Sequence, residues 1–229
     1  MSEGSGERKR SIFRLHWIGY GLLLISLFDT VQIFILPQFM NPVWEFQTIG
    51  VLVERLPVPL LGLAMVFFGE DQERGGWETG ILKLLSGLCL VLAVVFLLMI
   101  PLGIVDTFRI NELNNQRIEE QSQRQLDQLT NVETQVSRST PQDLQNIASE
   151  LGRLGFPVTN QKPEQLKEQI LSRLANAKKQ AEPQLEEARS SQRTLLLKNS
   201  VKWNLGALVG SVLFYLTWRS TPWVKRLGK

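Results

Sequence analysis

Three charged side chains lie inside stretches that are otherwise apolar. Asp29 lies within the run 15–36, and Glu54 and Arg55 stand side by side in the run 49–69. A charged group at membrane depth is costly unless it meets a partner or water. As helices, the two runs place these residues at similar depths, about 8–10 Å from their outer ends. We therefore predict an Asp29–Arg55 ion pair that fastens the two runs together, with an ion or proton pathway through Asp29 and Glu54 as the alternative.

Signatures of catalysis are absent from the sequence. It contains no phosphate-binding glycine-rich loop followed by Lys-Ser/Thr, no nucleophile elbow and no His-Glu-x-x-His pair. Cys89 is the one cysteine and His16 the one histidine, so neither a disulfide within the chain nor a Cys/His metal site can form. We expect no catalytic residues, no metal and no enzymatic activity. The net charge of +3 comes with basic residues at predicted membrane edges, which does not indicate a nucleic-acid surface.

The elements that position the charged residues are apolar runs long enough to cross a bilayer as helices. The predicted spans are residues 15–36, 49–69, 81–104 and 201–218. Pro57 and Pro59 follow Arg55 closely and predict a broken or kinked second span, because proline removes a backbone donor. Asn41-Pro42 is a plausible helix start before it. The predicted fold is an all-α integral membrane protein with a membrane bundle at 15–105 and a fourth transmembrane helix near the C-terminus.

A polar segment separates the third and fourth spans. Residues 106–200 are rich in Gln, Glu, Asn, Arg and Lys, and they carry leucines at helical spacing with breaks at Ser139-Thr-Pro141, between 152 and 163, and at Pro183. We expect an extramembrane helical hairpin, coiled-coil-like, that forms a solvated stalk; a partly disordered segment is the alternative. Residues 1–14 and 219–229 are basic arms, which places both termini in the cytoplasm and the stalk on the opposite side.

Tryptophans and glycines add two further predictions. The tryptophans all fall near predicted membrane edges, where amphipathic rings collect at the level of the headgroups. These interfacial anchors are Trp17, Trp44, Trp77, Trp203, Trp218 and Trp223. Gly206 and Gly210 form a small-xxx-small face in the fourth span, which lets two helices approach closely. This face packs either against another span of the same chain or against a second copy or a partner.

The membrane part resembles a known family. The run NPVWEFQTIGVLVERLPVPLLGLAMVFFG at 41–69, then IPLGIVDTFRIN at 100–111 and a Gln-rich stalk with a last span, is similar to the HpsJ-like membrane proteins of cyanobacteria. The family takes its name from hormogonium polysaccharide secretion, and the resemblance implies no catalytic residues. In such a membrane His16 could ligate a chlorophyll magnesium, although an interfacial polar anchor is the interpretation we favour; no other cofactor is expected.

Two functions follow from the pattern and the resemblance. The first is a non-catalytic scaffold or assembly factor that docks to other membrane complexes, photosynthetic complexes among them, and carries its stalk in the periplasm or the thylakoid lumen. The second is a component of an exopolysaccharide secretion system, since a helical hairpin between two spans resembles, in architecture, the oligomeric chain-length regulators of polysaccharide assembly. The sequence does not decide between thylakoid and plasma membrane, nor does it name the partners, the oligomeric state or any further role of Asp29 and Glu54.

Overall fold

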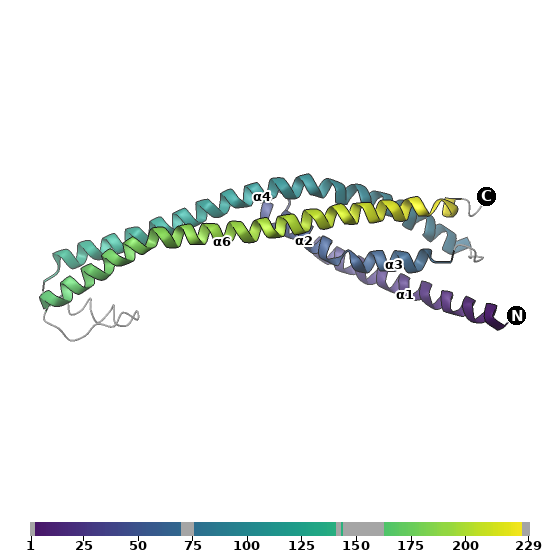
Figure 1. The fold of residues 1–229 in the computed structure, drawn as a ribbon, viewed down its shortest axis with the longest axis horizontal. Helices are drawn as coiled ribbons and strands as arrows, with labels where there is room; N and C mark the ends of the chain where they lie inside the picture. Colours follow the sequence, from purple (N-terminus) through teal and green to yellow (C-terminus); the bar gives the residue numbers. More distant parts are fainter. Residues whose placement is uncertain (1–2, 70–75, 141–142, 144–162, 226–229) are drawn as a thin grey trace. The chain divides into compact units, whose positions relative to one another are not determined.

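The protein is all-α in every part that the computed structural model describes, which is residues 3–69, 76–140, 143 and 163–225. Helices account for 92% of this part of the chain, and it contains no strand. The all-α prediction is thereby confirmed (Figure 1). The elements are α1 (Glu3–Ile33), α2 (Pro42–Arg55), α3 (Pro57–Phe67), α4 (Gly76–Arg138), α6 (Pro163–Ser220) and the 3-10 helix η1 (Pro222–Lys225).

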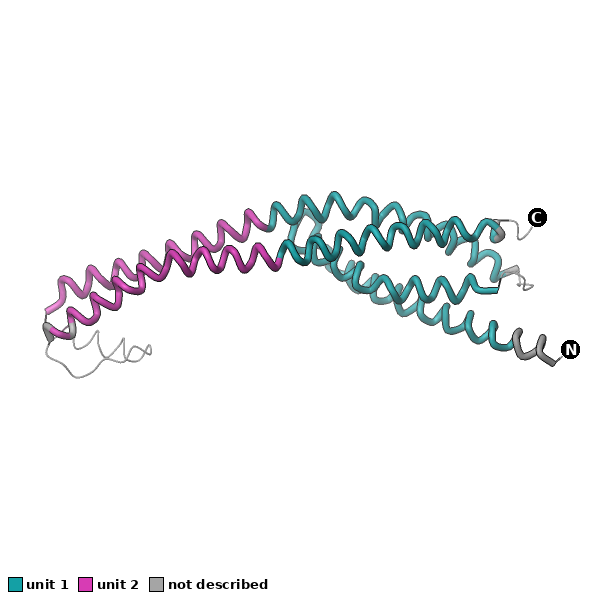
Figure 2. Tube along the Cα trace, in the orientation of Figure 1, with its two compact units in different colours: residues 1–110, 196–229 teal, residues 111–195 magenta. Residues whose placement is uncertain are grey.

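The chain divides into two compact units, which Figure 2 distinguishes by colour. The first, here called the bundle unit, comprises residues 1–110 and 196–229. The second, the hairpin unit, comprises residues 111–195. Helices α4 and α6 each contribute residues to both units.

Helices α2 and α3 form a bent pair, as the prolines predict. The Asn41 side chain caps α2 by accepting a hydrogen bond from the Val43 amide at 3.1 Å, with proline at the first helical position. Helix α2 ends at Arg55, α3 begins at Pro57, and the pair is bent by 41°. Helix α2 begins at Pro42, as Asn41-Pro42 predicts, and buries Phe46, and residue 49, where the second span is predicted to begin, lies inside this helix.

By length and composition, α1 from Arg10 to Ile33 and α4 from Trp77 are apolar enough to cross a membrane. The bent pair adds a third candidate if it is one span. The prediction of four spans is therefore too high on this criterion, since 201–218 within α6 is not among the candidates. The reason is dilution of its apolar residues by polar ones: Lys202, Asn204, Ser211, Tyr215 and Thr217.

Within the bundle unit, the last part of α6 lies antiparallel to the apolar part of α4. Three side-chain hydrogen bonds mark the register: Thr107 to Ser200 Oγ at 2.7 Å, Ser211 to the Ala93 carbonyl at 2.8 Å, and Ser86 with Thr221 at 2.8 Å. The rings of Phe96 on α4 and Phe214 on α6 stack on each other, with their centroids 5.7 Å apart. Helix α1 packs on α3, where Gly19 and Gly62 bring the two backbones close together.

The hairpin unit is a pair of antiparallel helix segments with a narrow apolar core. Val136, Ile170 and Leu174 are buried in it, and Glu133–Lys178 and Glu119–Arg189 form ion pairs across it. Helix α4 ends at Arg138, which confirms the break predicted at Ser139-Thr-Pro141. The break predicted at Pro183 is wrong, since α6 continues through that residue. The break predicted between 152 and 163 lies outside the described residues, except that α6 begins at Pro163.

Candidate functional site

The structure brings Asp29 and Arg55 together. Arg55 Nη1 lies 3.5 Å from Asp29 Oδ1 and donates a hydrogen bond to the Asp29 backbone carbonyl at 3.2 Å. The two side chains are 47% and 44% exposed, so the pair lies on the outer surface of the bundle unit rather than in its core. It ties the end of α2 to α1.

Glu54 has different partners from its neighbour Arg55. Its Oε1 accepts hydrogen bonds from Lys202 Nζ at 2.6 Å and from Trp203 Nε1 at 3.2 Å. Asp29 and Glu54 therefore belong to two separate ion pairs, one to each side of α2. Sequence reasoning missed Lys202 as a partner, although a lysine at the start of the last apolar run was a signal for it.

The Trp203 ring packs between α6 and α2, in a slot that is open because residue 50 is a glycine. The ring lies against Phe46, with centroids 4.6 Å apart, and over Gly50. A Cβ atom at Gly50 would lie 2.5 Å from the indole ring, closer than any real Cβ contact, so only glycine leaves room for the ring here. Trp203 is thus a packing residue as well as the membrane-edge residue that the sequence predicts.

The small-residue face of α6 packs within the same chain. A Cβ atom at Gly206 would overlap Val53 Cγ1, and one at Gly210 would lie 2.5 Å from Leu56 Cδ1. Of the two alternatives that the sequence leaves open, the structure has the contact with another helix of this chain, namely the end of α2.

The other tryptophans differ in exposure. Trp17 and Trp77 face outward, 66% and 88% exposed. Trp44 packs edge-on against Phe34 and Phe39, and Trp218 lies beside Tyr215. The Trp223 side chain is outside the described part of the chain.

His16 is buried at the junction of α1, α3 and α4. Its Nε2 lies 2.8 Å from the Phe68 carbonyl oxygen, which can only accept, so this nitrogen carries the hydrogen. Its Nδ1 lies 3.6 Å from Glu78 Oε1. Both ring nitrogens of His16 thus face protein groups.

A buried polar network joins α4 and α6 where the apolar part of α4 ends. Thr107 Oγ1 donates to Ser200 Oγ, and Asn204 Nδ2 donates to the Ser200 carbonyl at 2.8 Å. Asp106 beside it is completely buried, next to Glu45 and Arg109. Sequence reasoning did not single out these residues, because a polar residue just past an apolar run is ordinarily solvated.

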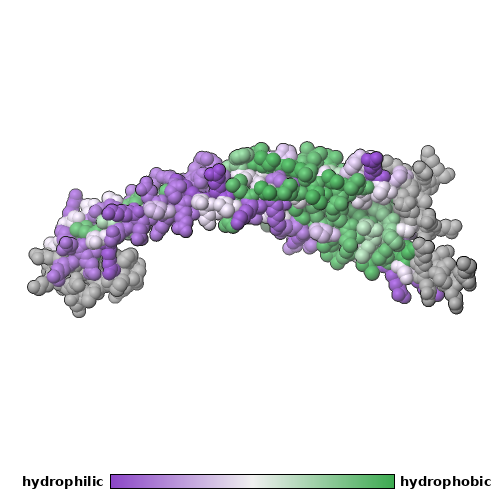
Figure 3. Space-filling model, viewed as in Figure 1, coloured by the Kyte–Doolittle hydropathy of each residue, from purple (hydrophilic) through white to green (hydrophobic). Residues whose placement is uncertain are grey.

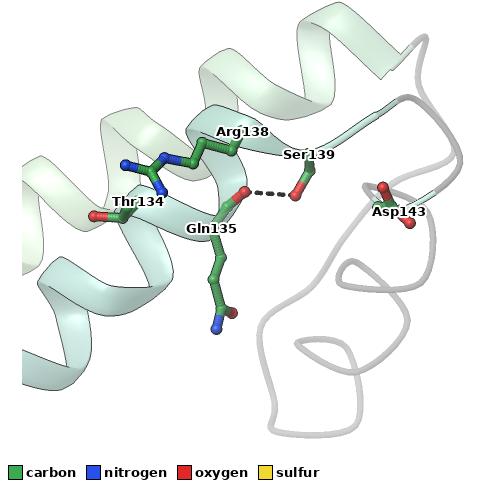
Figure 4. A pocket seen from close by; sticks show the side chains of 5 residues that line it. All are labelled: Thr134, Gln135, Arg138, Ser139 and Asp143. Atoms are coloured by element: carbon green, nitrogen blue, oxygen red, sulfur yellow. Dashed lines mark hydrogen bonds between the residues drawn. The ribbon is translucent and has the colours of Figure 1, made fainter.

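In the hairpin unit, an open pocket of about 400 Å³ lies at the end of α4 (Figure 4). It is lined by Thr134, Gln135, Arg138, Ser139 and Asp143. Hydrogen bonds from Thr140 lower the pKa of the exposed Asp143 carboxyl, which is outside the membrane-spanning part. The lining comes from consecutive turns of one segment, so it lacks the convergent polar groups of a ligand site.

Comparison with known proteins decides the family. A family model described as HpsJ-like protein matches residues 10–222. The chain belongs to the HpsJ-like family. The match contains the whole hairpin unit, most of the bundle unit and both ion pairs of α2. No curated protein and no solved structure was found to match the chain.

Removing the cation of the Asp29–Arg55 pair is expected to destabilise the bundle unit. Arg55→Leu leaves Asp29 without its cationic partner on a surface that the predicted spans place at membrane depth, whereas Arg55→Leu with Asp29→Leu removes both charges. We expect the double variant to regain part of the thermal stability lost in the single variant, measured on protein in detergent. Losses that simply add would show that the two residues are not coupled.

Proposed function

We propose that this HpsJ-like protein is a non-catalytic membrane scaffold or assembly factor, in which the bundle unit anchors the chain and the hairpin unit offers a polar surface to partners. The observation that carries this proposal is the distribution of exposed large hydrophobic side chains. They cover α1, the first part of α4 and the last part of α6, and none lies among the described residues of 111–194. Figure 3 shows the same difference in hydropathy between the surfaces of the two units.

The proposal includes a fourth membrane crossing by the last part of α6, which rests on packing rather than on composition. Of the polar residues within 201–218, Ser211 is buried and donates a hydrogen bond to the Ala93 carbonyl, and Asn204 is half-buried. The outward side chains of the middle part are apolar, among them Leu205, Val209 and Val212, while the exposed Lys202 and Tyr215 lie toward its two ends. A helix that hides polar groups and exposes apolar ones suits lipid. Because it runs beside the apolar part of α4 over its length, both helices would occupy the same depth range.

Four crossings place both termini on one side and the hairpin unit on the other, and the basic termini favour the cytoplasm. We expect single cysteines at Ser5 and Ser220, in a Cys89→Ser background, to react alike with an impermeant thiol reagent in sealed membrane vesicles. A cysteine at Ser172, exposed on the hairpin unit, is expected to react from the opposite side. Labelling of the Ser220 and Ser172 positions from the same side would show three crossings instead.

The scaffold function is tested by isolating the chain in mild detergent and identifying what co-purifies. We expect a complex of defined stoichiometry that is lost when exposed glutamines of the hairpin unit, Gln121, Gln125 and Gln128, are changed to lysine. In the matched control, Gln32 and Gln47, which are exposed glutamines of the bundle unit, are changed to lysine. We expect this variant still to form the complex. A preparation that stays free of partners under these conditions would contradict the proposal.

A second candidate is a component of exopolysaccharide secretion in a cyanobacterial membrane. It is favoured by membership of the HpsJ-like family and by the placement of a polar helical pair between apolar helices. This function predicts a regular homo-oligomer in mild detergent, and cells without the protein would export less polysaccharide. The scaffold function predicts a hetero-complex instead, in the thylakoid or the plasma membrane. The two are separated by the composition of the isolated complex.

A further inference from the structure

A buried carboxyl group lies just past the apolar run of α4, against a second carboxyl group. Asp106 stands two residues beyond the predicted span 81–104; its side chain is 0% exposed, and its Oδ2 has no hydrogen-bond partner. Arg109 Nη1 lies 3.4 Å from Asp106 Oδ1 and 3.6 Å from Glu45 Oε2, so one guanidinium nitrogen serves both carboxyl groups. Two ionised carboxylates only accept hydrogen bonds, so they can bond to each other only when one is protonated.

The same groups hold the connection between α1 and α2. The Met40 amide donates to Glu45 Oε1 at 2.9 Å, and Arg109 Nη2 donates to the Met40 carbonyl at 3.1 Å. Met40 has φ of 72°, in the left-handed region that residues other than glycine rarely adopt. The strained residue is thus held through both of its backbone polar groups. We call Met40, Glu45, Asp106 and Arg109 the carboxyl clamp.

We propose that the carboxyl clamp is a proton-binding site: a proton shared between Asp106 and Glu45 fastens the α1–α2 connection to α4, so that acidification at this end of the bundle unit strengthens the bundle. Arg109 is 44% exposed and Glu45 16% exposed, which gives protons a route from solvent to the clamp. The proposal goes beyond the scaffold function and needs no partner.

Charges around the clamp set the direction of the effect. Burial, followed by the negative charge of Glu45, raises the pKa of Asp106 from 3.8 to about 6 against the opposing effect of Arg109. On the α6 side the polar neighbours are the neutral Ser200 and Asn204, while Lys202 is paired with Glu54.

The sign of the pH dependence follows from this raised pKa. The folded state binds the proton more tightly than the unfolded state. Its contribution to stability is therefore full below pH 3.8 and is lost as the pH rises through about 6. Between pH 7.5 and pH 5.0 the site is expected to shift the folding equilibrium about tenfold toward the folded state.

The test is the thermal midpoint of the full chain in detergent at pH 7.5 and at pH 5.0. We expect the midpoint of the wild type to rise on acidification. Asp106→Asn, which is neutral at both pH values, should be as stable at pH 7.5 as at pH 5.0. Asp127→Asn changes an exposed aspartate of the hairpin unit and serves as the matched control, which should keep the pH dependence of the wild type.

Glu45→Gln provides a second, independent measurement. It removes the charge that raises the Asp106 pKa, so the transition is expected to move to lower pH. The proposal is overturned if Asp106→Asn retains the pH dependence of the wild type, or if the wild-type midpoint does not rise on acidification. Should Asp106→Asn fail to fold, an unchanged transition in Glu45→Gln overturns it instead. Because the readout is stability without a partner, failure of the scaffold function leaves this test unaffected.

Discussion

Trp203→Ala is expected to lower the free energy of unfolding of the bundle unit by about 3 kcal/mol, at the lower end of the range for loss of a packed aromatic side chain. The substitution empties the slot between Phe46 and Gly50. It also removes one of the two side-chain donors to Glu54 Oε1. In a membrane, where apolar side chains gain little from leaving lipid, this loss is mainly one of packing and hydrogen bonding.

The measurement is the temperature at which half of the detergent-solubilised monomer disappears from its size-exclusion peak. Trp17→Ala is the matched control, because Trp17 is also a predicted edge tryptophan but is 66% exposed. We expect the control to change the midpoint by much less. Equal shifts in the two variants would mean that Trp203 acts only as a membrane-edge anchor and that its slot contributes nothing.

Gly210→Leu is expected to destabilise the monomer itself by about 2 kcal/mol, a typical cost of overpacking. The reason is steric: a Cβ atom at this position would lie 2.5 Å from Leu56 Cδ1, at the bend between α2 and α3. The expected readout is increased protease sensitivity and a lower thermal midpoint of the monomer. Leu56→Ala in the same chain should recover part of the loss by making room, which would show that the two residues touch.

Gly87→Leu is the control for adding bulk to a bundle helix. Gly87 lies in the apolar part of α4, and a Cβ atom there meets nothing within 4 Å. We expect its monomer to keep the midpoint of the wild type. If Gly210→Leu removed a larger assembly while leaving the monomer as stable as before, the glycine face would serve a second copy or a partner rather than α2.

Local sequence determined the helical elements of this protein to a large extent. Asn41 caps α2 and Pro42 begins it, and Pro57 begins α3 at the bend that follows α2. The sequence predicts these features because asparagine caps and prolines act on the backbone within one turn. The end of α4 before Ser139 follows from the same local chemistry. Pro183 shows the limit of this reasoning: a proline that predicts a break lies within an unbroken helix.

Only the tertiary structure decided which polar groups meet. Charge and depth predicted an Asp29–Arg55 pair, but Glu54 pairs with Lys202, 148 residues away, because neighbouring residues on a helix point in different directions. Composition alone finds two or three candidate spans and leaves out the last part of α6. Ser211 of this part is hidden against α4 and its glycines pack against α2, an arrangement that an average over residues does not record. Asp106 is buried for the same reason: facing helices enclose it, and no property of its sequence neighbours requires that.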